Sequence, residues 1–264
     1  MTPLAAGLTP ATALILFLAA VGGSTIGSMA GGGTLVTFST LILLGMPGIM
    51  ANATSTVGLL PTGAAGVVGH REEMRAHRPW IAALLVPGLV GGMIGSALLI
   101  ATPPRFFEKL APFLVLFATS LFVVQGLFRS GKGSHVTRRP SAAKVVGVGS
   151  LLFAVAIYEG YFGAGSGILI LALLGFLGVG DIHAMNGLKG FFVVAINSVA
   201  STYFILRGAV HWPSALVMFA GAAVGGYGGT LLSRRIGRDR ARTAVIVIGV
   251  VLTIVLLLRR NLLS

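Results

Sequence analysis

Long apolar stretches alternate with short polar ones along most of this 264-residue chain. The run from Trp80 to Ala101 contains no charged residue, and about 20 such residues span a bilayer as a helix. Charged residues and chain breakers define four apolar blocks on each side of a polar linker, at residues 11–45, 51–69, 79–101, 110–128, 145–179, 184–206, 213–233 and 244–258. The pattern predicts an all-α polytopic membrane protein.

The two sets of blocks resemble each other when the chain is shifted by 134 positions without gaps. The shift pairs residues that are scarce in this chain: Asn52 with Asn186, His77 with His211, and Pro79 with Pro213. Internal repetition of this kind is typical of transporters that are built from two halves. We therefore expect a first membrane repeat at residues 1–128, a basic cytoplasmic linker at 129–144 and a second membrane repeat at 145–264.

The first block of each half is too long for a single crossing. A straight helix over residues 11–45 would measure about 50 Å, against a hydrocarbon core of about 30 Å. Glycines interrupt the two blocks, at Gly27 and 31–33 in the first half and at Gly160, Gly163, Gly165 and Gly167 in the second. We expect two short helices joined at each glycine turn, either crossing fully or forming a re-entrant hairpin. Each half then has about five helical segments, and an odd number makes the halves inverted repeats.

Positive charge is concentrated in the gaps between the apolar blocks. Only 9% of the residues are charged, whereas a soluble domain averages about 25%, and the formal net charge is +13. Basic residues beside membrane segments follow the positive-inside rule, so the charge indicates a lipid bilayer and no nucleic-acid partner. Ten segments place 13 Lys or Arg on one side and 5 on the other, whereas eight single crossings give 11 and 7. We prefer ten segments, with both termini outside and the linker inside.

The two glycine turns supply the first candidate site residues. Transporters with inverted repeats bind substrate near the midplane, where irregular backbone lines a cavity. Glycine lets backbone N–H groups approach a ligand, and a helix starting after the turn points its positive end at it, which favours an anion. Close packing of helices through small residues is the alternative, and it is the favoured explanation for residues 91–92 and 225–226. The candidates are Gly31, Gly32, Gly33, Gly165, Ser166 and Gly167.

Polar residues at the start of the third segment of each half form a second candidate set: Asn52, Thr54 and Ser55, then Asn186 and Lys189. The neutral donors among them can bind an anion weakly enough for it to be released again. Alternatively, these side chains have a structural role in helix capping or in hydrogen bonds between helices. Lys189 is the one Lys or Arg inside an apolar block. An intramembrane charge is costly and indicates a functional role, unless the side chain snorkels to the interface.

Glu159, beside the second glycine turn, is a candidate for carrying a coupling proton or for pairing with Lys189. A purely structural pairing is its alternative role. The chain has no cysteine, no zinc-ligand spacing and no nucleotide-binding glycine loop, so neither a metal site, a cofactor nor ATP-driven pumping is expected. No set of nucleophile, base and metal recurs within the spans, which argues against an intramembrane enzyme.

The glycine turn at 31–33, followed by the patch Ala51–Ser55, resembles the TauE/SafE family of sulfite and organosulfonate exporters, also called the TSUP family. The second half resembles a variant of this pattern at 163–167 and 186–189, and it departs from a second Thr-Ser pair by having Leu188 and Lys189. The resemblance covers nearly the whole chain. It implies that the substrate is a small anion such as sulfite, a sulfonate or thiosulfate, moved by a secondary mechanism.

These observations predict a secondary transporter of a small, sulfur-containing anion in a bacterial-type inner membrane, working by alternating access. A passive anion channel is one alternative, and a transporter of another small solute is a second. The sequence leaves open the anion, the direction of transport, the coupling ion and the oligomeric state, for which a homodimer is one arrangement.

Overall fold

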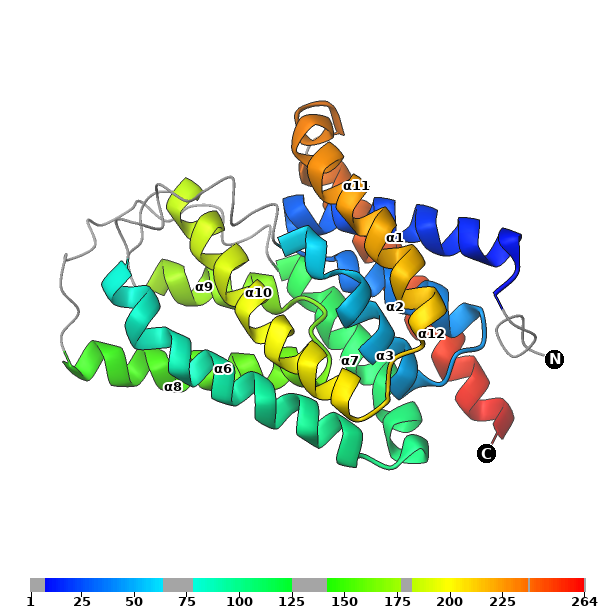
Figure 1. The fold of residues 1–264 in the computed structure, drawn as a ribbon, viewed down its shortest axis with the longest axis horizontal. Helices are drawn as coiled ribbons and strands as arrows, with labels where there is room; N and C mark the ends of the chain where they lie inside the picture. Colours follow the sequence, from blue (N-terminus) through cyan, green and yellow to red (C-terminus); the bar gives the residue numbers. More distant parts are fainter. Residues whose placement is uncertain (1–7, 64–77, 125–141, 177–181, 237, 264) are drawn as a thin grey trace.

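The computed structural model describes residues 8–63, 78–124, 142–176, 182–236 and 238–263. Within these ranges the chain forms ten α-helices of 11 residues or more and no β-strand (Figure 1). The first half contributes α1 (Pro10–Ala30), α2 (Gly33–Leu43), α3 (Gly48–Gly58), α6 (Arg78–Ala101) and α7 (Pro104–Val124). The second half contributes α8 (Ala142–Tyr161), α9 (Ser166–Phe176), α10 (Ile182–Leu206), α11 (Trp212–Ile236) and α12 (Arg238–Leu263). The prediction of an all-α protein is confirmed.

Four of the described helices are long and apolar enough to cross a bilayer, at Pro10–Ser28, Arg78–Ala101, Pro104–Val124 and Met185–Leu206. Shorter apolar helices occur at Gly33–Leu43, Val145–Tyr161, Ser166–Gly175 and Arg242–Leu258. Large apolar side chains on their outer faces are exposed, among them Val86, Leu116 and Val247. Such a surface suits lipid rather than water, because contiguous apolar area of this extent is rare on soluble monomers. The chain is a polytopic membrane protein.

Glycines break the long first block of each half. Helix α1 ends at Gly31, which has a φ of 87° and donates its N–H to Gly27 O. Gly163 and Gly165, between α8 and α9, have φ values of 76° and 80°, a region that L side chains rarely adopt. Helices α2 and α9 have 11 residues each, or about 16 Å, which is half of the hydrocarbon core. These lengths favour broken helices over two full crossings.

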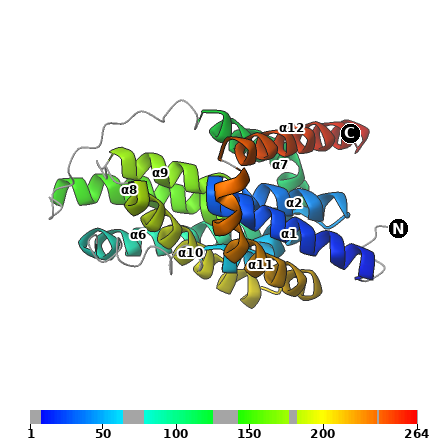
Figure 2. The same ribbon diagram turned by 90° about the horizontal axis from the view of Figure 1, so that it is seen from above.

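The helices pair across the two halves. Helix α1 packs along α11, and α6 packs along α8 (Figures 1 and 2). The shift of 134 positions aligns α1 with α8 and α6 with α11. The pair α1–α11 is therefore equivalent to the pair α8–α6. Helix α7 packs against its own equivalent, α12. An internal two-fold relation would produce this pattern, whereas the inverted orientation of the repeats stays a prediction.

Glycines bring the backbones of these helix pairs close together. A Cβ added to Gly95 of α6 would lie 2.1 Å from Ile157 O of α8. A Cβ added to Gly225 of α11 would lie 2.3 Å from Val21 O of α1. Gly91 faces α8 in the same way, with its added Cβ 2.6 Å from Phe153 O. Close packing through small residues therefore explains Gly91 and Gly225.

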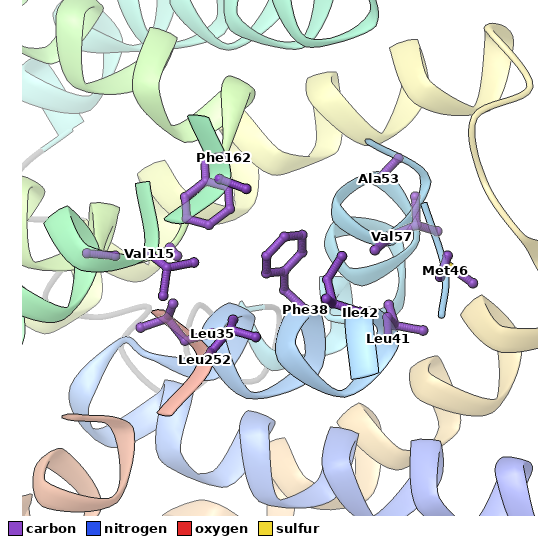
Figure 3. Close-up of a cluster of buried hydrophobic side chains, with 14 of the residues drawn as sticks. Leu35, Phe38, Leu41, Ile42, Met46, Ala53, Val57, Val115, Phe162 and Leu252 are labelled. Carbon is purple, nitrogen blue, oxygen red and sulfur yellow. The ribbon is translucent and has the colours of Figure 1, made fainter. Parts of the chain in front are cut away.

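The main hydrophobic core joins the second glycine turn to the first half of the chain (Figure 3). Phe162, directly after α8, packs edge-to-face on Phe38 of α2, with ring centroids 5.2 Å apart. Both rings are fully buried, and the edge-to-face arrangement is a favourable one for aromatic pairs. Leu35, Val115 and Leu252 complete this region from α2, α7 and α12. The contact holds the glycine turn of one half against a helix of the other.

The start of α1 and the end of α12 lie at the same end of the molecule in both views (Figures 1 and 2). An even number of crossings would place them on one side of the membrane. Which side they face stays a prediction. Residues 129–141 of the predicted linker and residues 71–77 of the basic loop lie outside the described residues.

Candidate functional site

A cavity of about 170 Å³ lies between the two halves, bordered by both glycine turns, α3 and α10. One water molecule needs only ~15 Å³ on a comparable measure, so the cavity has room for a small polyatomic ion. The lining side chains are small, hydroxylic or aliphatic, with two amides and one amine. They belong to Gly27, Ser28, Gly31, Gly33, Thr34, Thr56, Leu59, Leu60, Thr62, Gly63, Gly163, Ser166, Gly167, Asn186, Lys189, Gly190, Val193, Val194, Asn197 and Gly226.

The lining repeats with the internal shift of 134 positions. Both members of several aligned pairs border the cavity: Gly33 and Gly167, Thr56 and Gly190, Leu59 and Val193, Leu60 and Val194, and Gly63 and Asn197. The cavity therefore lies where the two halves face each other with equivalent surfaces. Transporters built from inverted repeats bind their substrates at such an interface.

One face of α10 forms a wall of the cavity. Its lining residues are Asn186, Lys189, Gly190, Val193, Val194 and Asn197, and steps of three and four place side chains on one side of a helix. Lys189 is buried, and its Nζ lies 3.5 Å from Asn186 Oδ1, at the outer limit of a hydrogen bond. Among the described lining residues Lys189 alone carries a formal charge, so the wall attracts anions.

The two glycine turns meet at this cavity. A Cβ added to Gly31 would lie 4.0 Å from Gly167 Cα, and one added to Gly167 would lie 3.5 Å from Lys189 Cδ. Ser166, the first residue of α9, also lines the cavity, and its Oγ donates to Gly163 O over 2.8 Å. The positive N-terminal ends of α2 and α9 both border the cavity, an arrangement that favours a bound anion.

Five of the residues predicted for the site do not line the cavity, namely Gly32, Asn52, Thr54, Ser55 and Gly165. A Cβ added to Gly32 would lie 2.7 Å from the methyl carbons of Val245, so this glycine faces α12. Gly165 faces α7, with its added Cβ 3.3 Å from Leu121 Cδ1. Both positions accommodate close packing between helices rather than a ligand.

The polar patch of α3 is used for hydrogen bonds between helices. Asn52 Nδ2 donates to Tyr161 O over 3.1 Å, and Thr54 Oγ1 accepts from the His211 backbone N–H over 3.0 Å. The hydroxyl oxygens of Ser55 and Thr37 lie 2.6 Å apart. All three patch residues are almost fully buried. This geometry fits the structural alternative, interhelical hydrogen bonding, for the patch.

Glu159 lies directly behind the cavity wall. The residue is 2% exposed, and Oε1 accepts a hydrogen bond from Asn197 Nδ2 over 3.1 Å. Oε2 is buried and has no hydrogen-bond partner in the structure. Asn197 lines the cavity, so one amide separates the carboxyl group from the space that a substrate would occupy.

Sequence reasoning missed several lining residues, chief among them Asn197 and Thr56. Asn197 follows Asn186 by about three helical turns and therefore shares its face of α10. That spacing, read together with Lys189, is a signal that identifies Asn197. Thr56 directly follows the patch of α3, but a lone threonine in a membrane helix gives no comparable signal.

No cluster of three or more His, Cys, Asp or Glu side chains able to hold a metal ion occurs in the part of the chain that the structure describes. His211 precedes α11, and its Nδ1 lies 2.9 Å from Ser214 Oγ. The hydrogen bond gives His211 a local role at the start of that helix. His77 lies outside the described residues.

A family model described as "Sulfite exporter TauE/SafE" matches residues 15–256. The chain belongs to the TauE/SafE family. It is 27% identical over 240 residues to a "Probable membrane transporter protein" of Haemophilus influenzae, covering 90% of this chain and 92% of the relative. It is also 27% identical over 245 residues to the "Probable membrane transporter protein ORF9" of a Sinorhizobium species, covering 92% and 91%. No solved structure matches the chain.

Membership of the TauE/SafE family confirms the resemblance noted in the sequence. Together with the apolar helices, it makes the chain an integral membrane transporter that resides in the lipid bilayer. The cavity between the halves is the feature of this TauE/SafE protein that is best placed to hold what it transports.

Proposed function

We propose that this TauE/SafE protein is a secondary transporter of a small, sulfur-containing anion, such as sulfite, a sulfonate or thiosulfate, in the cell inner membrane. One observation carries the proposal: the cavity between the halves combines a buried cationic side chain, Lys189, with neutral donors and the positive ends of two helices. Each of these groups presents positive charge, full or partial, to the cavity, and together they do not form a defined set of ligands for one particular anion. They would suit an oxyanion better than a cation or a neutral solute.

The lining offers a separate role to each kind of group. Lys189 supplies a point charge, and Asn186 and Ser166 supply hydrogen-bonding groups beside it. Leu60 and Val194, an aligned pair, would face the carbon part of an organic sulfonate. A mostly apolar cavity with a few convergent polar groups is the usual form of a small-molecule site.

Alternating access would follow from the same architecture. The glycine contacts within α1–α11 and α6–α8 make each pair a closely packed unit. Rocking of such units about the cavity would expose it to one side of the membrane and then to the other. In this proposal the residues around the cavity stay in place relative to the anion while the surrounding helices move.

The proposal keeps both termini outside the cell membrane and the basic linker at 129–144 in the cytoplasm. A reporter fused to the C-terminus tests this, and a cytoplasmic signal would reverse the orientation.

Binding and flux of sulfite, thiosulfate, sulfoacetate and taurine by the purified protein test the proposal. We expect at least one of these compounds to bind saturably and to exchange across the membrane of proteoliposomes. Flux that does not saturate and never accumulates the anion uphill would indicate a passive channel. If none of the four is bound or moved, the substrate class is wrong.

A further inference from the structure

A buried acid behind the cavity wall has no function in the site described so far. Glu159 is 2% exposed, and only one of its two carboxylate oxygens has a hydrogen-bond partner in the structure. An ionised carboxylate without a full set of donors is costly in an apolar interior. A carboxylic acid in the same place is neutral and has an O–H to donate. The surroundings of Glu159 therefore suit a group that gains and loses a proton.

The polar neighbours of Glu159 are neutral groups. Asn197 Nδ2 donates to Oε1, which leaves Oε2 for the proton. The carboxyl group also lies against the side chain of Ser166. The Ser166 hydroxyl donates to Gly163 O and carries no charge. Neither polar neighbour therefore supplies a positive charge that would compensate an ionised carboxylate.

Few other charged groups face this position. Helices α6, α9 and α10 pack against α8. Among side chains that the structure describes, α6 has only Arg78, at its first residue, and α9 has no titratable group. Helix α10 contributes Lys189 and Tyr203, and on α8 itself Tyr158 donates its hydroxyl to Ala164 O while Tyr161 lies at the end of the helix. Lys189 is thus the cation on the same cavity wall as Asn197, the hydrogen-bond partner of Glu159.

The cavity connects the acid to the proposed anion site. Asn197 and Ser166, polar neighbours of Glu159, both line the cavity that Lys189 also lines. Lys189 and Asn197 are separated by about 12 Å along α10, which sets the scale for the separation between an anion near Lys189 and the carboxyl group beside Asn197. At an effective dielectric constant of about 20, two unit charges about 12 Å apart change each other's binding constant about tenfold. A bound anion therefore opposes ionisation of Glu159, and a proton on Glu159 favours the anion by the same factor.

We propose that Glu159 is the proton site of this transporter, and that the anion in the cavity crosses the membrane together with a proton on Glu159, in the same direction. The inference rests on the proposed function, because it needs an anion in this cavity. The proton enters as the carboxylate becomes a carboxylic acid and leaves when the anion is released on the other side. No covalent bond of the anion is formed or broken.

Proteoliposomes carrying the purified full-length protein provide the test. Counterflow of labelled thiosulfate, sulfite, sulfoacetate and taurine at equal pH on both sides comes first, because it tests the proposed function without any proton gradient. The anion that exchanges is then the probe. With the membrane potential held at zero and one proton per anion, a gradient of one pH unit should sustain about tenfold accumulation on the alkaline side. A pH-sensitive dye inside the vesicles should report protons entering with the anion.

Glu159→Gln keeps the shape of the side chain and cannot lose a proton. We expect it to retain counterflow but to lose accumulation driven by the pH gradient and to move no protons. Glu108→Gln, an exposed acid on α7, is the matched control and should behave like the parent. If the parent exchanges anions without proton movement, or if Glu159→Gln still accumulates them in a pH gradient, the inference is wrong.

A measurement on the parent alone covers the case in which Glu159→Gln does not fold. In unbuffered detergent solution, addition of the probe anion to the purified protein should cause proton uptake by the protein. Proton release, or no change, would overturn the inference. Failure of counterflow for all four compounds would instead overturn the proposed function.

Discussion

The third helix of each half, α3 and α10, carries polar residues at aligned positions, and the two patches have different surroundings. Asn52 and Ser55 of α3 are buried in hydrogen bonds to neighbouring helices. Asn186 and Lys189, their partners in the alignment, lie on the face of α10 that lines the cavity. In this comparison aligned positions of the two halves have different surroundings, one in contacts between helices and the other at the cavity.

The difference has a physical origin in the side chains. Ser55 is small enough to fit beside Thr37 with their hydroxyl oxygens 2.6 Å apart. The long amine of Lys189 needs more room than such a position offers, and beside the cavity it borders a space that can hold an anion.

The largest effects should come from the helix contacts that both halves share. Gly225→Ala places a Cβ 2.3 Å from Val21 O, so we expect a severe loss of folded protein. Gly228→Ala on the same helix has open space and is the control. Size-exclusion profiles and Tm in detergent measure both. Equal yields and Tm values for the two variants would contradict the packing of α1 on α11.

A side chain at the second glycine turn should abolish transport without unfolding the protein. A Cβ on Gly167 fits, at 3.5 Å from Lys189 Cδ, but a leucine would extend into the cavity. Gly167→Leu should therefore lose counterflow and Gly167→Ala should keep part of it. Gly175→Leu, at an exposed position of α9, is the control for insertion and folding. Normal counterflow in Gly167→Leu would remove this turn from the site.

Removing the charge of α10 should weaken anion binding by about 1–3 kcal/mol, the cost of losing a hydrogen bond to a charged group. Lys189→Met removes the charge at similar length, and Lys189→Arg should be partly defective because the guanidinium is larger and planar. Ser55→Ala, at the aligned position, should leave the affinity unchanged. Equilibrium binding of the probe anion separates these variants, and parental affinity in Lys189→Met would support a lysine that only snorkels.

The smallest effects should distinguish the two asparagines. Asn52→Ala removes the hydrogen bond from the buried Asn52 amide to the partly buried Tyr161 carbonyl, so we expect a stability loss of about 1 kcal/mol and parental affinity. Asn186→Ala should instead lower the affinity several-fold and leave Tm near that of the parent. Tm and binding measured on the same preparations check this. Loss of affinity in Asn52→Ala alone would reverse the comparison.

Much of the fold follows from local properties of the sequence. The apolar blocks predict the helices, and the glycines at 31–33 and 163–167 predict the breaks, because positive φ there strongly favours glycine. The shift of 134 positions predicts which helices are equivalent. It cannot predict that α1 packs on α11, because that pairing depends on how two halves associate in three dimensions.

The site could be predicted only in part. Gly31, Gly167 and Lys189 converge at the cavity as expected for residues of one site. Thr54 and Ser55 looked equally suitable, since a sequence does not reveal whether a buried hydroxyl faces a ligand or a neighbouring helix. Asn197 could have been found from its spacing, whereas the position of Glu159 behind it depends on the packing of α8 on α10.

Protection of engineered cysteines by the anion tests the location of the site most directly, because the native chain has no cysteine. Thr56→Cys and Val193→Cys place a thiol at the cavity from two different helices, α3 and α10, and Ser55→Cys places one in the buried patch of α3. We expect a small water-soluble thiol reagent to label the first two and not the third. At ten times its Kd, the transported anion should slow that labelling about tenfold. Labelling of both cavity thiols at an unchanged rate in saturating anion would contradict the assignment of this cavity as the transport site.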